Sequence, residues 1–194
     1  VLQIVGPPGN VIAYNHDSRG LDPQIEFVAP ADGKYVVRVF GFPFDRGRLD
    51  TAHHPFSGGA DGDIRIATRY DEGDFMKSLM AVIHETGHAL YEDGRPSQWL
   101  GQPVGHCRGM TLHESQSLLM EMQAGRSAQF CRHLSGLLRE TFPGNDAALS
   151  PDNLLRIYNR VEPGFIRVDA DEVTYPAHVI LRYQLAKALF RGDL

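Results

Sequence analysis

The residues best suited to chemistry are two histidines and a glutamate in His84-Glu85-Thr86-Gly87-His88, an HExxH motif. On a helix, residues four apart share one face, so His84 and His88 would lie about 5–6 Å apart at their Cβ atoms. This spacing suits two nitrogen ligands of one Zn²⁺ ion, which binds imidazole at about 2.0–2.1 Å. Glu85 lies about 100° further round the helix, where it could act as the base that activates a water molecule. The motif therefore predicts the metal site of a metallopeptidase.

One helix, from Asp74 to Gly94, must position these side chains. Asp74 can cap its first turn, and Gly94 can adopt the left-handed conformation after its last residue. Three fixed letters also arise by chance, so the character of the helix matters. Apolar residues surround most of it, which predicts that it is buried. Buried histidines and carboxylates need partners, and a metal ion would be one.

A catalytic zinc usually takes three protein ligands, so a third must come from elsewhere in the chain. A second long helix is predicted from Met110 to Leu138, and Glu114 lies near its start. The segment between the two helices is rich in glycine and proline, so a turn there could bring Glu114 beside the histidines. The position equally suits a plain acidic residue in the first turn of a helix, where the helix dipole favours negative charge. Spacing alone leaves both interpretations open.

Five blocks of the sequence resemble the carboxypeptidase Taq family of metallocarboxypeptidases. They follow the family's order over about 41–194 and are GRLDTAHHPFSGG, DIRIATRY, HETGHALYE, LHESQSLLMEMQAGRS and IRVDADEVTYPAHVILRYQLAKAL. The resemblance implies a mostly helical, saddle-shaped metalloenzyme that removes C-terminal residues from peptides and is usually a homodimer. At the matching positions it implies that His84, His88 and Glu114 bind the metal. It also implies that Glu85 is the general base.

A carboxypeptidase needs a cation for the terminal carboxylate of its substrate, and the planar guanidinium of arginine can bind it with two hydrogen bonds. Arg167 matches a family arginine before the DEVTYP segment and is the first candidate, and Arg65 is the second. A surface salt bridge is the alternative for each. The resemblance also implies that His54 and Tyr175 line the cleft, although His54 could instead be a loop histidine that caps backbone groups. The family has threonine where this chain has Ala67.

Two carboxylates are candidates for hydrogen bonds to the ligand histidines, a common support for zinc. Asp171 belongs to an acidic pair with Glu172, and Glu92 lies one turn after His88. The alternative for Glu172 is ordinary negative charge at the start of the following helix. Zn²⁺ is the expected cofactor, and the ligand spacing also admits Co²⁺ or Mn²⁺.

The remaining elements are shorter. Residues 63–69 alternate apolar and polar side chains, which predicts a half-buried strand with which an extended peptide could pair. Turn-forming residues predict a loop over 46–62. A serine followed by proline predicts the start of a helix over 150–162, and another helix is predicted over 176–191, ended by a glycine. Residues 164–168 are predicted to be strand-like.

Residues 1–44 differ from the rest, with short β-type runs separated by turn residues. They resemble part of a bacterial pre-peptidase C-terminal domain, a β-sandwich, in the pattern DP…FVAPADGKYVVRV. A generic β segment is the alternative. The expected fold class is mainly α: a helical zincin-type core over 45–194 with a short N-terminal β-rich segment. Relative to the Taq family, the region over 45–194 is expected to be incomplete at both ends, so fragment, fusion and truncated product all stay open.

Composition narrows the function classes. The chain has 194 residues, 42% of them hydrophobic, and a net charge of −5. With no basic cluster and no apolar run near the ~20 residues of a membrane span, neither nucleic acid nor membrane is an expected partner. Cys107 and Cys131 make no disulfide framework and no signal peptide is visible, which favours the cytoplasm. Export would be expected if the β-rich segment is an export-associated domain.

The expected function is a metal-dependent carboxypeptidase that acts on peptides, with metal-activated water and a glutamate base. Because a ligand set can be complete while the substrate cleft is not, a catalytically impaired metal-binding fragment or interaction module is the alternative. An endopeptidase or dipeptidase with the same ligands is a third reading.

Overall fold

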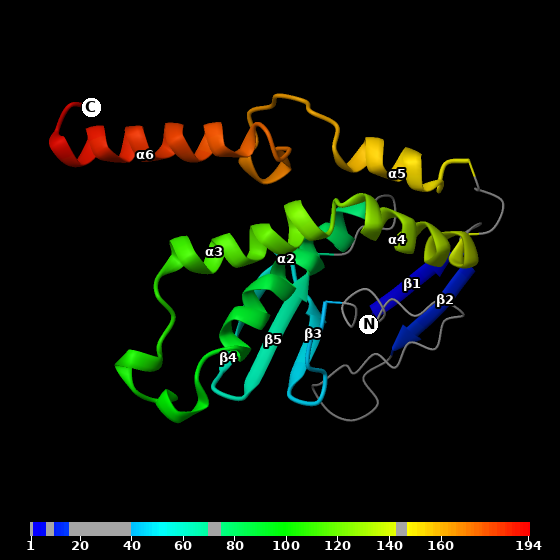
Figure 1. The fold of residues 1–194 in the computed structure, drawn as a ribbon, viewed down its shortest axis with the longest axis horizontal. Coiled ribbons are helices and arrows are strands. Elements are labelled where there is room, and N and C mark those ends of the chain that lie inside the picture. Colours follow the sequence, from blue (N-terminus) through cyan, green and yellow to red (C-terminus); the bar gives the residue numbers. More distant parts are fainter. Residues whose placement is uncertain (1, 7–9, 16–39, 70–74, 143–146) are drawn as a thin grey trace.

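The computed structural model describes residues 2–6, 10–15, 40–69, 75–142 and 147–194. It is mainly helical, with a three-stranded sheet beside the helices and a separate two-stranded hairpin (Figure 1). The mainly α fold class predicted from the sequence is therefore confirmed.

The hairpin consists of β1 (Leu2–Gly6) and β2 (Asn10–Asn15), which pair antiparallel. These strands confirm the first two β-type runs predicted near the N-terminus. The predicted run at 25–28, and the run at 34–40 except for its last residue, Phe40, lie outside the described residues.

The three-stranded sheet contains β3 (Gly47–Thr51), β4 (Phe56–Ala60) and β5 (Asp63–Thr68) in the order β3-β5-β4. β3 runs parallel to β5, and β4 runs antiparallel to it. The strand at β5 is confirmed, but the predicted loop over 46–62 is wrong, because pairing with β5 overrides the weak strand propensity of these glycine-rich segments. Both edges of β5 are hydrogen-bonded, so the prediction that a peptide pairs with β5 is also wrong.

The predicted HExxH helix is confirmed as α2 (Phe75–Asp93). Asp74, its predicted cap, lies outside the described residues. The N–H of Gly94 donates to the carbonyl of Leu90, 2.9 Å away, but Gly94 is not among the glycines with positive φ. The predicted left-handed ending at Gly94 is therefore wrong, since the chain leaves α2 directly into a turn.

Helix α2 packs between the sheet and the other helices. On one side Val82 and Ala89 join Ile64 and Ile66 of β5 in a small apolar cluster. On another side Met80 and Ile83 enter a larger core, whose other buried members are Phe130, Cys131, Leu134, Leu138, Leu149, Leu154 and Tyr158. This double packing fixes the orientation of the motif.

The chain from α2 to the next helix passes through two short 3₁₀ turns, η1 (Ser97–Trp99) and η2 (Pro103–Gly105). The single helix predicted over 110–138 is wrong. It is divided into α3 (Met110–Leu118), a π-helical turn η3 (Leu119–Ala124), and α4 (Ala128–Thr141). The helix is interrupted before α4, where the hydroxyl of Ser127 caps the first turn of α4.

The C-terminal part begins with α5 (Pro151–Tyr158), whose predicted serine cap is confirmed, although the helix ends earlier than expected. The predicted strand at 164–168 is wrong, because the chain forms a 3₁₀ turn there, η4 (Arg167–Asp169). The last helix, α6 (Tyr175–Arg191), is confirmed, and Gly192 ends it with φ of 77°. Helix α6 extends away from the rest of the molecule, and none of its residues is buried (Figure 1).

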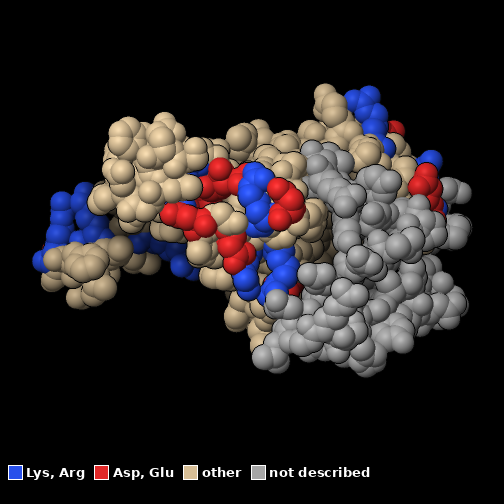
Figure 2. All heavy atoms as spheres, turned by 90° about the horizontal axis from the view of Figure 1, so that it is seen from below, with Lys and Arg blue, Asp and Glu red and all other residues tan. Residues whose placement is uncertain are grey.

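Seen from below, acidic and basic side chains lie intermingled near the centre of the described surface (Figure 2). The described ion pairs include Arg46–Asp93, at 2.7 Å, and Arg65–Asp63, at 2.8 Å. Among the described residues, no helix combines the length and the apolar character that crossing a membrane requires.

Candidate metal centre

The structure brings the three predicted ligands together. One nitrogen of His84, one nitrogen of His88 and one oxygen of Glu114 all lie within 4.8 Å of one another. Glu114 Oε2 lies 3.3 Å from His88 Nε2 and 3.8 Å from His84 Nε2. Glu114 therefore faces both histidines across the gap between α2 and α3.

This approach depends on Gly87, which lies inside the motif. A Cβ atom at Gly87 would lie 2.6 Å from the Cα atom of Ser117 and 2.7 Å from the carbonyl oxygen of Gln116. Ser117 is fully buried at the same contact. The absence of a side chain at Gly87 thus lets the backbones of α2 and α3 touch, and this contact places Glu114 opposite the histidines.

The donor set fits a divalent metal ion. The hydrogen bond with His88, together with His84 and Tyr175, lowers the pKa of Glu114 to about 2 against the opposing effect of burial. Glu114 is therefore a carboxylate at neutral pH. Two imidazoles and one carboxylate form the three-residue set of catalytic zinc sites, which leaves a fourth position for water or substrate.

Glu85 lies beside this set and is only 7% exposed. Burial raises the pKa of its carboxyl group, and the negative charges of Glu114 and Glu121 act in the same direction, while His84 and His88 lower it. The net pKa lies above the ordinary value. A carboxyl group whose pKa is raised toward neutral pH can accept a proton and donate it again during one reaction.

His84 has a carboxylate partner that sequence analysis missed. Its Nδ1 atom lies 2.9 Å from Glu121 Oε2, and Glu121 Oε1 accepts a hydrogen bond of 2.9 Å from Arg126. Burial alone would lower the pKa of His84, but Glu121 and then Glu114 outweigh it and raise the pKa. Glu121 lies seven residues after Glu114, hence on the same helical face, and that spacing was the available signal. The π-helical turn in which it lies is a feature frequent at functional sites.

The predicted supporting carboxylates occupy different places. Glu92 Oε1 lies 2.8 Å from Nε2 of His113, a residue to which the sequence gave no role. Asp171 instead accepts hydrogen bonds from the backbone N–H groups of Glu162, Val173 and Thr174, and one from the Thr174 hydroxyl. Burial would raise the pKa of Asp171, but these four donors lower it to about 2. Asp171 thus organises the turn before α6.

Two of the predicted substrate-binding residues lie beside the candidate ligands. The Tyr175 hydroxyl donates to Glu114 Oε1 at 3.1 Å, and Arg167 donates to the Tyr175 oxygen at 2.7 Å. Burial, followed by the charge of Glu114, raises the pKa of Tyr175. The guanidinium of Arg167 is thus two hydrogen bonds away from a candidate metal ligand.

The other two predicted substrate-binding residues lie elsewhere. Arg65 is exposed on β5 and pairs with Asp63, whereas its neighbours Ile64 and Ile66 are buried against α2. Since successive side chains of a strand point to opposite faces, Arg65 faces away from the helix that carries the motif. His54 is exposed in the connection between β3 and β4.

A hollow of about 510 Å³ lies at another part of the contact between α2 and α3. Leu90, Trp99 and Met120 are among the residues that line it, and the candidate ligands are not among them. Gly87 of the motif also lines it, so the hollow lies next to the metal centre.

The fold and the site together show the ligand pattern of the HExxH class of metallopeptidases, with a glutamate as third candidate ligand. Its family follows from comparison with known proteins. The chain belongs to the carboxypeptidase Taq (M32) metallopeptidase family, whose model matches residues 28–194. The match begins inside the predicted β-rich segment, so the domain boundary at residue 44 stays a prediction.

Three relatives illustrate the similarity. Carboxypeptidase 1 of Bacillus subtilis is 38% identical over 184 residues, which cover 90% of this chain and 37% of that protein. Thermostable carboxypeptidase 1 of Thermus thermophilus is 43% identical over 161 residues, or 82% of this chain and 31% of that protein. The solved structure of Trypanosoma cruzi metallocarboxypeptidase 1 is 46% identical with a TM-score of 0.79, and the match covers 84% of this chain and 34% of that one. The chain therefore spans about a third of the length of these relatives.

Proposed function

We propose that this chain carries the metal centre of a carboxypeptidase that hydrolyses the C-terminal peptide bond of peptides. The observation that carries the proposal is the convergence of His84, His88 and Glu114 on one point, with the buried carboxyl group of Glu85 beside them. These three residues would hold one divalent ion, for which Zn²⁺ suits the nitrogen and oxygen donors best, with Co²⁺ or Mn²⁺ as alternatives. When bound, such an ion polarises the scissile carbonyl and lowers the pKa of a water molecule.

Glu85 moves the proton in this proposal. Its carboxylate accepts a proton from the attacking water as the new carbon–oxygen bond forms. It then gives that proton to the amide nitrogen as the carbon–nitrogen bond breaks, so that an amine leaves. The pKa of Glu85, raised by burial in the metal-free chain, is closer to neutral pH than that of an ordinary carboxyl group, which suits a group that takes up a proton and gives it back.

Arg167 is the residue that we assign to the terminal carboxylate of the substrate. Its guanidinium is half-buried and is held by Tyr175, which in turn contacts Glu114. A carboxylate bound there would place the last peptide bond close to Glu85 and the metal ligands. Arg65 suits the role less well, because it faces away from α2. A role for His54 in the cleft stays a prediction, as do a homodimer and a cytoplasmic location.

The test is release of the C-terminal residue from an N-blocked peptide, with and without Zn²⁺ or Co²⁺, in parallel with Glu85→Gln. We expect metal-dependent release by the parent chain and none by the variant. A second peptide with an amidated C-terminus should resist cleavage, because it lacks the carboxylate that Arg167 binds. Cleavage of both peptides at internal bonds would instead indicate an endopeptidase. Tight zinc binding without release by the parent would establish the alternative, a metal-binding fragment that is catalytically impaired.

A further inference from the structure

The two ring nitrogens of His88 face different groups. Nε2 lies 3.3 Å from Glu114 Oε2 and faces the candidate metal position. Nδ1 lies 2.6 Å from Nδ1 of His113, which comes from the first turns of α3. Each nitrogen of His88 therefore has a partner of its own, one inside the metal centre and one outside it.

We propose that His113 is a positioning residue that holds His88 in the tautomer and orientation that leave Nε2 free to bind the metal ion. The inference rests on the metal site proposed above. It adds a residue that is not one of the three candidate ligands.

The hydrogen-bond chain fixes where each proton lies. A neutral imidazole carries one N–H and one bare nitrogen, so a contact between two Nδ1 atoms must hold a single proton. His113 Nε2 lies 2.8 Å from Glu92 Oε1, and a carboxylate only accepts. His113 therefore carries its proton on Nε2, and its bare Nδ1 accepts the N–H of His88. With its Nδ1 proton held by His113, His88 keeps Nε2 as the nitrogen that faces Glu114, and Nε2 can act as a ligand once a metal ion takes the place of its hydrogen bond to Glu114.

The carboxylate of Glu92, at the end of this series of hydrogen bonds, is itself held in place. Arg95 Nε lies 2.7 Å from Glu92 Oε2, and the same guanidinium donates to Asp61 in the β4–β5 turn and to the carbonyl of Gly105. The side chains of His113 and Arg95 are only 12% and 15% exposed. The imidazole of His113 and the guanidinium of Arg95 are therefore largely protected from water, which strengthens the hydrogen bonds that they make, whereas Glu92 and Asp61 are 31% and 40% exposed.

The two ligand histidines consequently have different supports. His84 reaches a carboxylate directly, at Glu121, while His88 reaches Glu92 only through the imidazole of His113. The ring of His113 also lies against His88 and Tyr91, with centroid distances of 4.7 and 4.8 Å. Packing and hydrogen bonding thus restrain the same ring.

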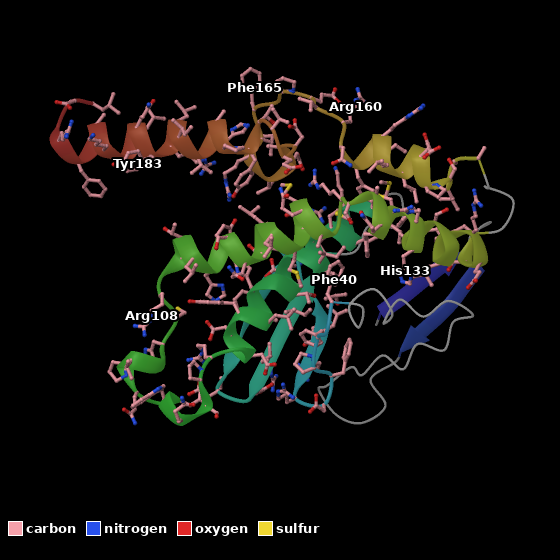
Figure 3. All side chains as sticks on the ribbon, viewed as in Figure 1. Phe40, Arg108, His133, Arg160, Phe165 and Tyr183 are labelled. Atoms are coloured by element: carbon pink, nitrogen blue, oxygen red, sulfur yellow. The ribbon has the colours of Figure 1, made fainter. Side chains whose placement is uncertain are left out.

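The proposal is tested by Zn²⁺ affinity, measured by competition with a chromophoric chelator. His113→Leu removes the acceptor, and we expect the affinity to fall about 10–100-fold, the usual effect of losing such a partner. His113→Gln keeps an acceptor oxygen and a donor nitrogen, so it should restore part of the loss. His133→Leu is the matched control, because His133 lies on α4, away from the α2–α3 contact (Figure 3). The zinc affinity of this variant should equal that of the parent chain.

A second readout separates tautomer control from general damage. In nitrogen-15 NMR of the metal-loaded protein, the parent should show a protonated Nδ1 at His88, and this signal should weaken or shift in His113→Leu but not in His133→Leu. If His113→Leu fails to fold, His113→Gln and Glu92→Gln provide the same comparison with smaller expected losses. Parent-like affinity in folded variants at both positions would overturn the proposal. Failure of the parent itself to bind zinc would overturn the metal site first.

Discussion

The contact between Gly87 and Ser117 makes a prediction that links packing to metal binding. In Gly87→Ala, the new methyl group would meet the Ser117 Cα atom at 2.6 Å, whereas ordinary van der Waals contact begins at 3.4 Å. Backbone atoms cannot swing aside, so α2 and α3 must separate by about 0.8 Å or distort. Metal–ligand distances tolerate only about 0.2 Å of change. Glu114 on α3 would then be too far from His84 and His88 on α2.

The expected magnitudes differ for stability and for metal binding. Overpacking of this kind costs about 1–3 kcal/mol, while replacing a helical glycine by alanine returns up to about 1 kcal/mol. The free energy of unfolding should therefore fall by no more than about 3 kcal/mol. Zinc affinity should fall at least about tenfold, because the ligand geometry itself changes.

The assay pairs chelator competition with thermal unfolding in the absence of metal. Gly136→Ala on α4 is the control, because a Cβ atom there meets nothing within 4 Å. That variant should keep the zinc affinity of the parent and should be slightly more stable. If Gly87→Ala behaves in the same way, the close contact between α2 and α3 does not set the position of Glu114, and our account of the site is wrong.

Three further predictions concern the surrounding structure. Leu134→Ala removes a core side chain that is 2% exposed, so chemical denaturation should show a loss of about 2–5 kcal/mol. Ser127→Ala removes the hydroxyl that accepts the N–H of Phe130, so thermal unfolding should show a loss of about 1 kcal/mol. Asp171→Asn turns an amide N–H toward a backbone donor, which should cost about 1–3 kcal/mol. The pKa of Asp171 in the folded chain, about 2, lies below the ordinary value near 3.9, so its stabilisation is present above about pH 4 and is lost as the pH falls toward 2. Urea unfolding at pH 5 and pH 2.5 should therefore show a larger difference between parent and Asn variant at pH 5, and an equal difference at both pH values would contradict this assignment.

The elements that local patterns specify are those that sequence analysis predicted correctly. The HExxH helix, the cap at Ser150 and the end of the last helix at Gly192 each depend on residues within one or two turns. The strands β3 and β4 depend on pairing with β5, which no local pattern encodes, and they were predicted as loop. The π-helical turn likewise interrupts a predicted helix, and it packs against α2, a contact between distant segments that no local pattern encodes.

The candidate site divides in the same way. His84, His88 and Glu85 follow from a motif whose spacing matches the helical repeat. The roles of His113 and Glu121 require the register between two helices, which a sequence pattern does not supply. Both lie within the block LHESQSLLMEMQAGRS, so their presence was visible while their partners were not.

The alignment of α2 with α3 and η3 explains how the contact between Gly87 and Ser117 positions all the residues of the metal centre. Helices α2 and α3 run antiparallel, so residues later in α2 lie opposite residues earlier in the second segment. His88 accordingly meets His113, and His84 meets Glu121 beyond the end of α3, while Glu114 lies between them and faces both histidines. The contact at Gly87 lies between these two pairs of residues and keeps α2 close to α3. The ligand set therefore depends on α2, α3 and η3, whereas the segment from η4 to α6 contributes the side chains proposed for the substrate, Arg167 and Tyr175.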